Sequence, residues 1–322
     1  MKTLVVDDDE LIRELLVEIL AAHGYENITQ AESGEDALAK ISQSDQPFDC
    51  FMFDIQMPGM DGIELCSHVR AMAQYKDSPV LMITAMNNQD YIGRAFSAGA
   101  TDYVTKPFDT TELITRVRLA DRLQSETKRA SAAAATALAK PKPAFSEPVA
   151  ITEIKGFVNS AVLENYVMIN LEQKHFPLAA VALQIPELAL VHAGSSSDEF
   201  QFVLTDIAEV ISDILCGSQA FMSYVGGGVF ICVGNRHTMP DAGDLRSELV
   251  VMLNDPDLVF CDEVHTSFTA IVGDKSAPKL FEKRGDLRFL DRAVESMKAA
   301  IATSDGGRAK KLAGGSQVAF AA

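Results

Sequence analysis

Cysteine is scarce in this sequence of 322 residues, and its five cysteines contain no Cys-x-x-Cys pair. This absence excludes a thiolate zinc site and argues against a disulfide framework. The sequence also has no uninterrupted apolar run of about eighteen residues, so we expect no membrane span. The first residues, MKTLVVDDDE, turn acidic too soon for a signal peptide. We therefore expect a cytoplasmic protein in a reducing compartment.

Acidic residues outnumber basic residues in this sequence. The chain has 28 Lys and Arg against 45 Asp and Glu, a net charge of −17, and both the first 125 residues and the rest are acidic. Proteins that bind nucleic acid usually present a basic face to the phosphates. No helix-turn-helix pattern is present either. A DNA-binding regulator is therefore disfavoured.

Short apolar runs alternate with helical patterns over the first part of the chain. The strands are predicted at residues 3–6, 28–30, 50–53, 80–83 and 103–104. The helices are predicted at residues 11–20, 35–41, 61–72, 90–98 and 110–123. Strict alternation of this kind is typical of a doubly wound α/β fold, with a parallel sheet of five strands and helices on both faces.

A composition change marks the domain boundary. Residues 126–149 are rich in alanine, which prolongs a helix, and then contain Pro141, Pro143 and Pro148, which end it. We predict a domain at 1–125, a helical and then extended linker at 126–149, a second domain at 150–304 and a flexible tail at 305–322.

The second domain is also predicted to be α/β, but with antiparallel strands in its sheet. Its predicted strands are 178–185, 220–225, 229–233 and 266–272, and its predicted helices are 158–174, 200–215, 245–253 and 287–300. Three glycines, 226–228, separate two of the strands. They indicate a tight hairpin turn with positive φ rather than a phosphate-binding loop, because no Gly-Lys-Ser/Thr and no helix follows.

Polar side chains follow four of the first five strands. They are Asp7 and Asp8, then Asp54, Thr84 and Lys106. Since the carboxyl ends of parallel strands lie at one edge, these residues should converge. Three carboxylates would repel each other without a cation, and oxygen ligands suit Mg²⁺. A carboxylate beside a divalent ion and a lysine can accept a phosphoryl group. Alternatively, the acidic run after the first strand only caps a helix.

The motifs VVDDD, FDIQMPGMDG, ITA and TKPF resemble, in order and spacing, the receiver domain of two-component response regulators over residues 1–125. The resemblance implies a flavodoxin-like fold, Mg²⁺ as cofactor and a sensor histidine kinase or phosphotransfer protein as partner. It also implies individual roles: Asp54 as phosphoacceptor, Asp7, Asp8, Asp54 and the backbone carbonyl of Gln56 at the metal, Lys106 pairing with the phosphoryl group, Thr84 and Tyr103 as the switch, and a cis bond before Pro107.

A second resemblance covers roughly residues 151–301. SYVGGGVFICV is similar to the signature hairpin of GGDEF diguanylate cyclases, and PLAAVALQIPEL, HTSFTAIVGD and LDRAVESMKAA lie where that family has a metal strand, a core strand and its last helix. This implies a nucleotide-cyclase-like fold.

The departures from the GGDEF pattern lie at the positions that bind metal and substrate in that family. The acidic positions of the pattern are occupied by Gly228, Val229, Gln184 and Pro186. His192 stands where the family has an asparagine and Gln201 where it has an aspartate, and residues 217–220 lack the RxxD site. Only Asp291 and Lys298 match the pattern. We therefore expect a catalytically inactive output domain that signals by binding a protein or a nucleotide. A phosphorylation-dependent homodimer fits the same scheme. The alternative is an active or residual diguanylate cyclase that uses GTP.

Overall fold

The computed structural model describes residues 1–85, 89–136, 142–151, 154–173, 177–255, 267–278 and 287–312. The chain forms two compact units, Met1–Pro141 with Ile169–His175, and Lys142–Met168 with Phe176–Ala322. Among the described residues, no helix is both long and apolar enough to span a membrane. Pro141, the start of the predicted strand at 266 and the tail beyond residue 312 lie outside the described residues.

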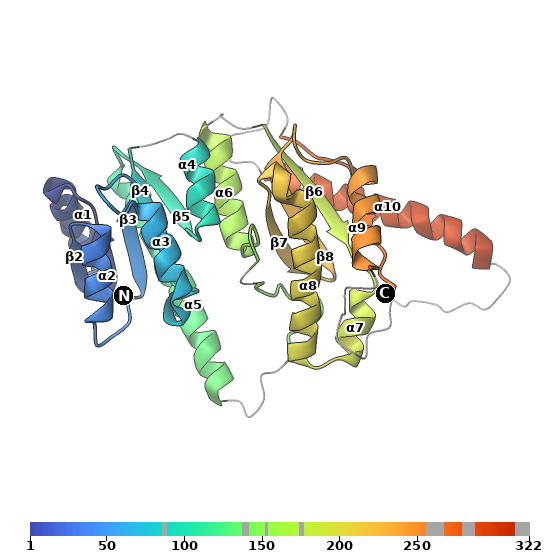
Figure 1. The fold of residues 1–322 in the computed structure, drawn as a ribbon, viewed down its shortest axis with the longest axis horizontal. Coiled ribbons are helices and arrows are strands. Elements are labelled where there is room, and N and C mark those ends of the chain that lie inside the picture. The colour runs from blue at the N-terminus through green and yellow to red at the C-terminus, as the bar shows by residue number, and fades with distance from the viewer. Residues whose placement is uncertain are drawn as a thin grey trace. The chain divides into compact units, whose positions relative to one another are not determined.

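The first unit is built on a parallel sheet of five strands in the order β2-β1-β3-β4-β5 (Figure 1). The strands are β1 Thr3–Val6, β2 Ile28–Ala31, β3 Cys50–Asp54, β4 Val80–Thr84 and β5 Asp102–Thr105. The central strands β1, β3 and β4 are buried along their whole length, which reflects helices on both faces, whereas only Ala31 is buried in the edge strand β2. The predicted doubly wound fold is therefore confirmed for this unit.

Five helices cover this sheet: α1 Glu10–Ala22, α2 Gly34–Ser42, α3 Gly62–Ala71, α4 Gln89–Ser97 and α5 Thr110–Thr136. On one face, Leu16 and Leu20 of α1 share a core with Leu113 and Val117 of α5. The α5 helix continues into the alanine-rich stretch, as predicted, because alanine has the highest helix propensity. It ends at Thr136 among the described residues.

The second unit contains a sheet of four strands in the order β7-β8-β6-β9, and all three pairings are antiparallel. The strands are β6 Leu178–Gln184, β7 Phe221–Gly226, β8 Val229–Asn235 and β9 Ile271–Val272. The strand predicted at 266–272 is wrong in its extent. The Asn254 side chain hydrogen-bonds the backbone N–H and C=O of Phe268, at 2.9 and 2.8 Å, so a side chain replaces a neighbouring strand there.

The helices of the second unit are α6 Ser160–Gln173, α7 Leu188–Gly194, α8 Ser197–Leu215, α9 Ala242–Leu253 and α10 Arg288–Leu312. Helix α7 was not predicted, because seven residues are too few to establish a helical period. Helix α10 continues past residue 305, where the sequence analysis places the start of the tail.

The glycine turn between β7 and β8 has the predicted conformation. The φ angles of Gly226, Gly227 and Gly228 are 89°, 64° and 75°. Residues 142–149, predicted to form the extended end of the linker, instead associate with the second unit, since Phe145 and Val149 pack against its core. The sequence pattern did not reveal this, because prolines indicate an extended chain without indicating what it contacts.

Candidate functional site

Three carboxylates meet at the carboxyl ends of the parallel strands. Asp7 and Asp8 directly follow β1, and Asp54 is the last residue of β3. One oxygen from each of the three side chains lies within 4.8 Å of the others. Asp7 is 1% exposed and Asp54 is 6% exposed, whereas Asp8 is exposed. The sheet therefore brings together the acidic residues that the sequence analysis selected.

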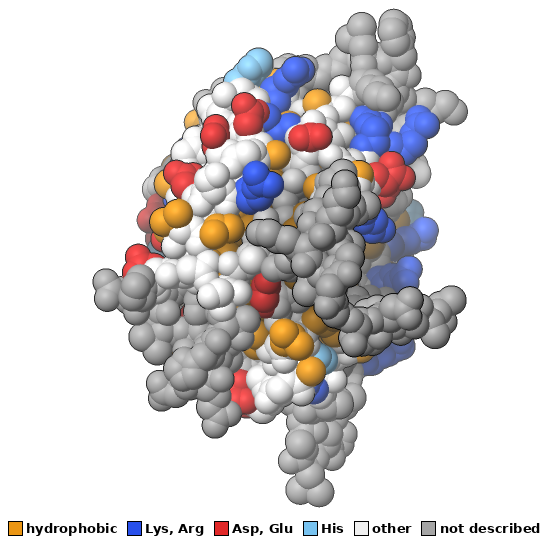
Figure 2. Space-filling view, turned by 90° about the vertical axis from the view of Figure 1, so that its right-hand side faces the viewer, with side chains coloured by type: hydrophobic (Ala, Val, Ile, Leu, Met, Phe, Trp, Pro, Cys, Tyr) orange, Lys and Arg blue, Asp and Glu red, His pale blue; other side chains and the backbone are white. Residues whose placement is uncertain are grey.

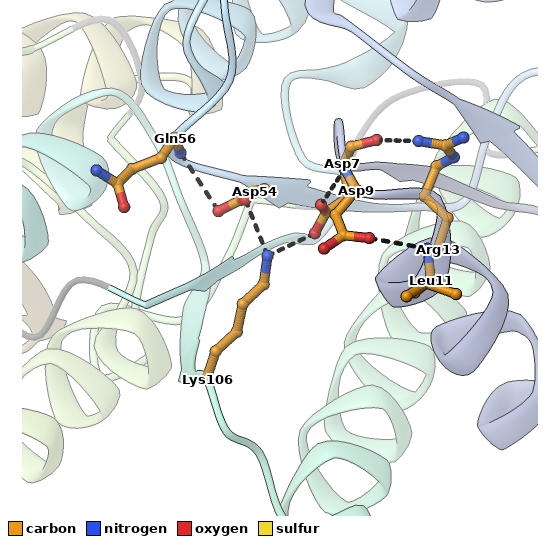
Figure 3. Close-up of polar contacts among 7 residues, drawn as sticks. All are labelled: Asp7, Asp9, Leu11, Arg13, Asp54, Gln56 and Lys106. Carbon is orange, nitrogen blue, oxygen red and sulfur yellow. Dashed lines mark hydrogen bonds and ion pairs between the residues drawn. The ribbon is translucent and has the colours of Figure 1, made fainter.

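Lys106 lies between two of these carboxylates (Figure 3). Its Nζ is 2.6 Å from Asp7 Oδ2 and 2.8 Å from Asp54 Oδ2. The lysine follows β5, and its backbone N–H donates to the carbonyl of Thr84 at 2.7 Å. The Lys106–Pro107 bond is cis, as predicted. One ammonium group thus pairs with two buried carboxylates from separate strands.

Burial and charge act in opposite directions on these groups. Burial raises the pKa of Asp54, and the nearby Asp7 charge adds to this, while Lys106 and the Gln56 N–H oppose it. Burial alone would lower the pKa of Lys106, but hydrogen bonds and charges from Asp54 and Asp7 outweigh it, so that pKa is raised. Lys106 therefore remains an ammonium group at neutral pH.

The three aspartates that follow β1 make different contacts. Asp9 is the N-cap of α1, and its side chain accepts from Leu11 N at 2.9 Å. Asp7 Oδ1 accepts from Asp9 N at 3.0 Å, which leaves Oδ2 to pair with Lys106. The helix-capping alternative therefore holds for Asp9. It does not account for Asp8, which contributes to the carboxylate cluster.

The predicted switch residues are both buried near this site. Thr84 ends β4 and is 0% exposed, and Tyr103 of β5 is 2% exposed. Strand register places Tyr103 beside Met82 and Thr84 beside Thr105. The hydroxyl of Tyr103 is buried without a hydrogen-bond partner in the structure. Rotation of this ring would break no hydrogen bond.

One ion pair near the switch was missed by the sequence analysis. Asp102 of β5 accepts from Arg116 of α5 at 3.1 and 3.3 Å, and the Asp102 side chain is only 4% exposed. It ties the strand that carries Tyr103 to α5. No local pattern signals this contact, because the two residues lie on different elements.

The donor set suits a hard divalent cation. Carboxylate oxygens are the ligands that Mg²⁺ prefers, and an exposed Asp8 leaves room for the waters that Mg²⁺ retains. Gln56 contributes its backbone N–H to Asp54 Oδ1 at 3.3 Å. The residues present therefore fit the predicted Mg²⁺.

Comparison with known proteins assigns the first unit. The family model "Response regulator receiver domain" matches residues 3–118. Chemotaxis protein CheY-3 of Vibrio cholerae is 39% identical over 113 residues, which cover 35% of this chain and 85% of CheY-3. The chain belongs to the response regulator receiver family. The receiver domain thus contains the carboxylate cluster, Lys106, Thr84 and Tyr103.

Two further relatives extend beyond a receiver domain. Transcriptional regulatory protein ResD of Bacillus subtilis is 39% identical over 126 residues, or 39% of this chain and 50% of ResD. Response regulator MprA of Mycobacterium avium is 40% identical over 118 residues, or 37% of this chain and 50% of MprA. The matched region spans about half the length of these relatives.

Three polar residues of the second unit that the sequence analysis singled out make hydrogen bonds within that unit. Gln184 Nε2 donates to Gly227 O at 3.0 Å, and Gln201 Nε2 donates to Ala150 O at 3.2 Å. His192 Nε2 lies 2.8 Å from Pro143 O. Among the described residues, the carboxylate cluster of the receiver domain is the one group of three or more ligand side chains arranged to hold a metal.

Proposed function

We propose that this chain is a response regulator in which Asp54 accepts a phosphoryl group from a sensor histidine kinase or a phosphotransfer protein. The observation that carries the proposal is the position of Lys106 Nζ, 2.8 Å from Asp54 and 2.6 Å from Asp7. An ammonium group at this point can neutralise charge on the phosphoryl oxygens during in-line transfer.

The residues of the site have distinct parts in this reaction. Asp7, Asp8 and Asp54, with the backbone carbonyl of Gln56, would hold Mg²⁺, which when bound supplies further positive charge toward the phosphoryl oxygens. A carboxylate oxygen of Asp54 attacks phosphorus, the phosphorus–nitrogen bond of phosphohistidine breaks, and the imidazole leaves with the electron pair and takes up a proton. Lys106 then pairs with the acyl phosphate.

Phosphorylation would act on the switch by adding charge. A phosphoryl group brings about −1.5 to −2 charges and strong acceptor oxygens. The Thr84 hydroxyl then turns to the phosphoryl group, and the Tyr103 side chain moves with it. These two residues form the bistable element of the switch. The buried Asp102–Arg116 pair supports a mechanical route from β5 into α5.

The second unit is proposed to be a catalytically inactive GGDEF-like output domain that binds a protein or a nucleotide. Gly228 and Val229 have no metal-binding side chain, and the Gln184 amide is already engaged by Gly227. The alternative is a diguanylate cyclase that makes cyclic di-GMP from GTP. Incubation with GTP and Mg²⁺, with chromatography of the products, distinguishes them, since cyclic di-GMP would contradict the inactive form.

Other outputs are weaker candidates. ResD is named a transcriptional regulatory protein, yet this chain has a net charge of −17. On the face in Figure 2, acidic and hydrophobic side chains lie mainly on the left and in the middle, and several Lys and Arg side chains gather along the right-hand edge. A gel shift on genomic fragments tests DNA binding. Size-exclusion chromatography with and without a phosphodonor tests the phosphorylation-dependent homodimer.

Phosphoryl transfer itself is tested with acetyl phosphate and Mg²⁺. We expect acid-labile phosphate on the wild-type chain and none on Asp54→Ala. Asp9→Asn is the matched control, because Asp9 caps α1 and asparagine caps equally well. Labelling that persists in Asp54→Ala would place the acceptor elsewhere.

A further inference from the structure

A short segment before the second unit's first helix lies across the glycine turn. The N–H of Gly227 donates to the carbonyl of Phe145 at 2.7 Å. A Cβ added at Gly226 would lie 2.3 Å from Ser146 O, which is far inside van der Waals contact. The segment can approach the turn this closely because glycine has no side chain.

The same segment is also held at the C-terminal end of α7. Lys142 Nζ donates to the carbonyls of His192 and Ser195. The carbonyl of Pro143 can only accept, so His192 donates to it from Nε2, at 2.8 Å. A positive charge at the carbonyl end of a helix is favourable.

Aromatic contacts anchor the middle of the segment. The ring centroid of Phe145 lies 5.4 Å from that of His192 and 6.5 Å from that of Phe200. Phe145 packs against the hydrophobic core of the second unit, and Lys142 Nζ lies 5.8 Å from the Phe200 centroid. Phe145 is thus a half-buried anchor residue, and the basic residue three positions earlier contacts the same aromatic group.

The segment has a defined conformation of its own. Ala144 N donates to Glu147 Oε2 at 3.0 Å, and Glu147 N donates to Ala144 O at 2.9 Å. These bonds close a turn around Phe145. Ser146 and Glu147 are exposed, so the outer side of the turn faces solvent. A peptide with this turn would lose less conformational freedom on binding than an unstructured one.

We infer that the second unit carries a peptide-binding site, formed by the glycine turn, the end of α7 and Phe200, and that residues 142–147 are its ligand, bound in cis. We call this segment the strap. The ligand class is a short peptide with a lysine three residues before an aromatic residue. A ligand that reaches the backbone of Gly227 must first displace the strap. This inference does not depend on the proposed phosphoryl transfer.

A tethered ligand has an effective concentration in the millimolar range. A free peptide of the same sequence, added at about micromolar concentration, therefore cannot compete with an intact strap. When the strap's own anchors are removed, the peptide meets a vacant site.

The test uses the full chain and a fluorescent peptide of residues 142–148, KPAFSEP. We expect the double variant Lys142→Met, Phe145→Ala to bind the peptide at least tenfold more tightly than the wild type does. Phe202→Ala is the matched control, because Phe202 is 55% exposed on α8. It should bind as weakly as the wild type.

Hydrogen exchange of the Gly227 amide provides a second measurement, which does not need the peptide. We expect exchange to be at least tenfold faster in Lys142→Met, Phe145→Ala, with unchanged exchange for the β8 amides that pair with β6. This comparison also shows that the variant is folded. Equal peptide binding by wild type and double variant, or no peptide binding by the variant together with unchanged Gly227 exchange, would overturn the inference.

Discussion

The ammonium nitrogen of Lys106 lies 2.8 Å from an oxygen of Asp54, a residue that is only 6% exposed. The two residues are far apart in the sequence. Asp54 ends β3 and Lys106 directly follows β5, and because these strands are not adjacent, the sheet order creates the contact. Because the same lysine also pairs with Asp7, one positive charge is shared by two negative charges.

Removing the shared ammonium should destabilise the receiver domain. We expect Lys106→Met to lower the free energy of unfolding by about 3 kcal/mol, because two buried carboxylates lose their partner. Added Mg²⁺ should recover part of the loss by supplying positive charge. Lys40→Met is the control, since Lys40 and Asp36 form a half-exposed i,i+4 helix pair and such pairs contribute about 0.3–0.5 kcal/mol. Denaturant titration with and without MgCl₂ measures this, and equal losses in both variants would contradict it.

Asp8 should contribute to Mg²⁺ affinity but little to stability. It is exposed in the structure and lies in the carboxylate cluster. Removing one of few anionic ligands weakens binding of a hard cation, so we expect Asp8→Asn to weaken Mg²⁺ binding at least tenfold. Asp9→Asn should leave it unchanged. Calorimetric titration of both variants provides the measurement, and an unaltered affinity in Asp8→Asn would remove Asp8 from the metal ligands.

Two buried tyrosines should respond differently to loss of the hydroxyl group. The hydroxyl of Tyr103 has no hydrogen-bond partner in the structure, whereas that of Tyr224 accepts from Gly228 N at 3.2 Å. We expect Tyr103→Phe to keep or raise the free energy of unfolding, and Tyr224→Phe to lower it by about 1 kcal/mol. Urea denaturation of the matched pair tests this. A larger loss in Tyr103→Phe would show that its hydroxyl is bonded in solution.

Asp206 on α8 should make stability depend on pH. Burial, with the charge of Glu209, raises its pKa from 3.8 to about 6. The folded state therefore holds this proton more tightly, so the contribution is favourable below pH 3.8 and is lost as pH rises to about 6. We expect Asp206→Asn to stabilise the protein at pH 7.5 by less than about 1 kcal/mol, because the group is partly exposed.

The stability gained in Asp206→Asn should disappear near pH 3.5, which is below the pKa of Asp206 in both the unfolded and the folded state. Glu209→Gln should recover part of it at pH 7.5 by removing the neighbouring charge. Thermal unfolding at the two pH values checks the sign, and a loss of stability in Asp206→Asn at pH 7.5 would contradict it.

Several features could be predicted from the sequence because they depend on local patterns. Strands such as β1 and β4 are short apolar runs bounded by polar residues, and their length and flanking residues identify them. The rule that ligands bind at the carboxyl ends of parallel strands then placed Asp7, Asp8, Asp54 and Lys106 together before any coordinates. Positive φ at Gly226–Gly228 followed from the same kind of local reasoning.

Other features needed the tertiary structure, because they depend on partners distant in the sequence. The division of tasks among Asp7, Asp8 and Asp9 depends on where Lys106 and Leu11 lie. The backbone of Phe268 forms hydrogen bonds with the Asn254 side chain instead of with a neighbouring strand. Residue propensities cannot predict this contact. The prolines near Phe145 predicted an extended chain, but only the fold places that chain on the glycine turn, where the absence of a side chain allows backbone to contact backbone.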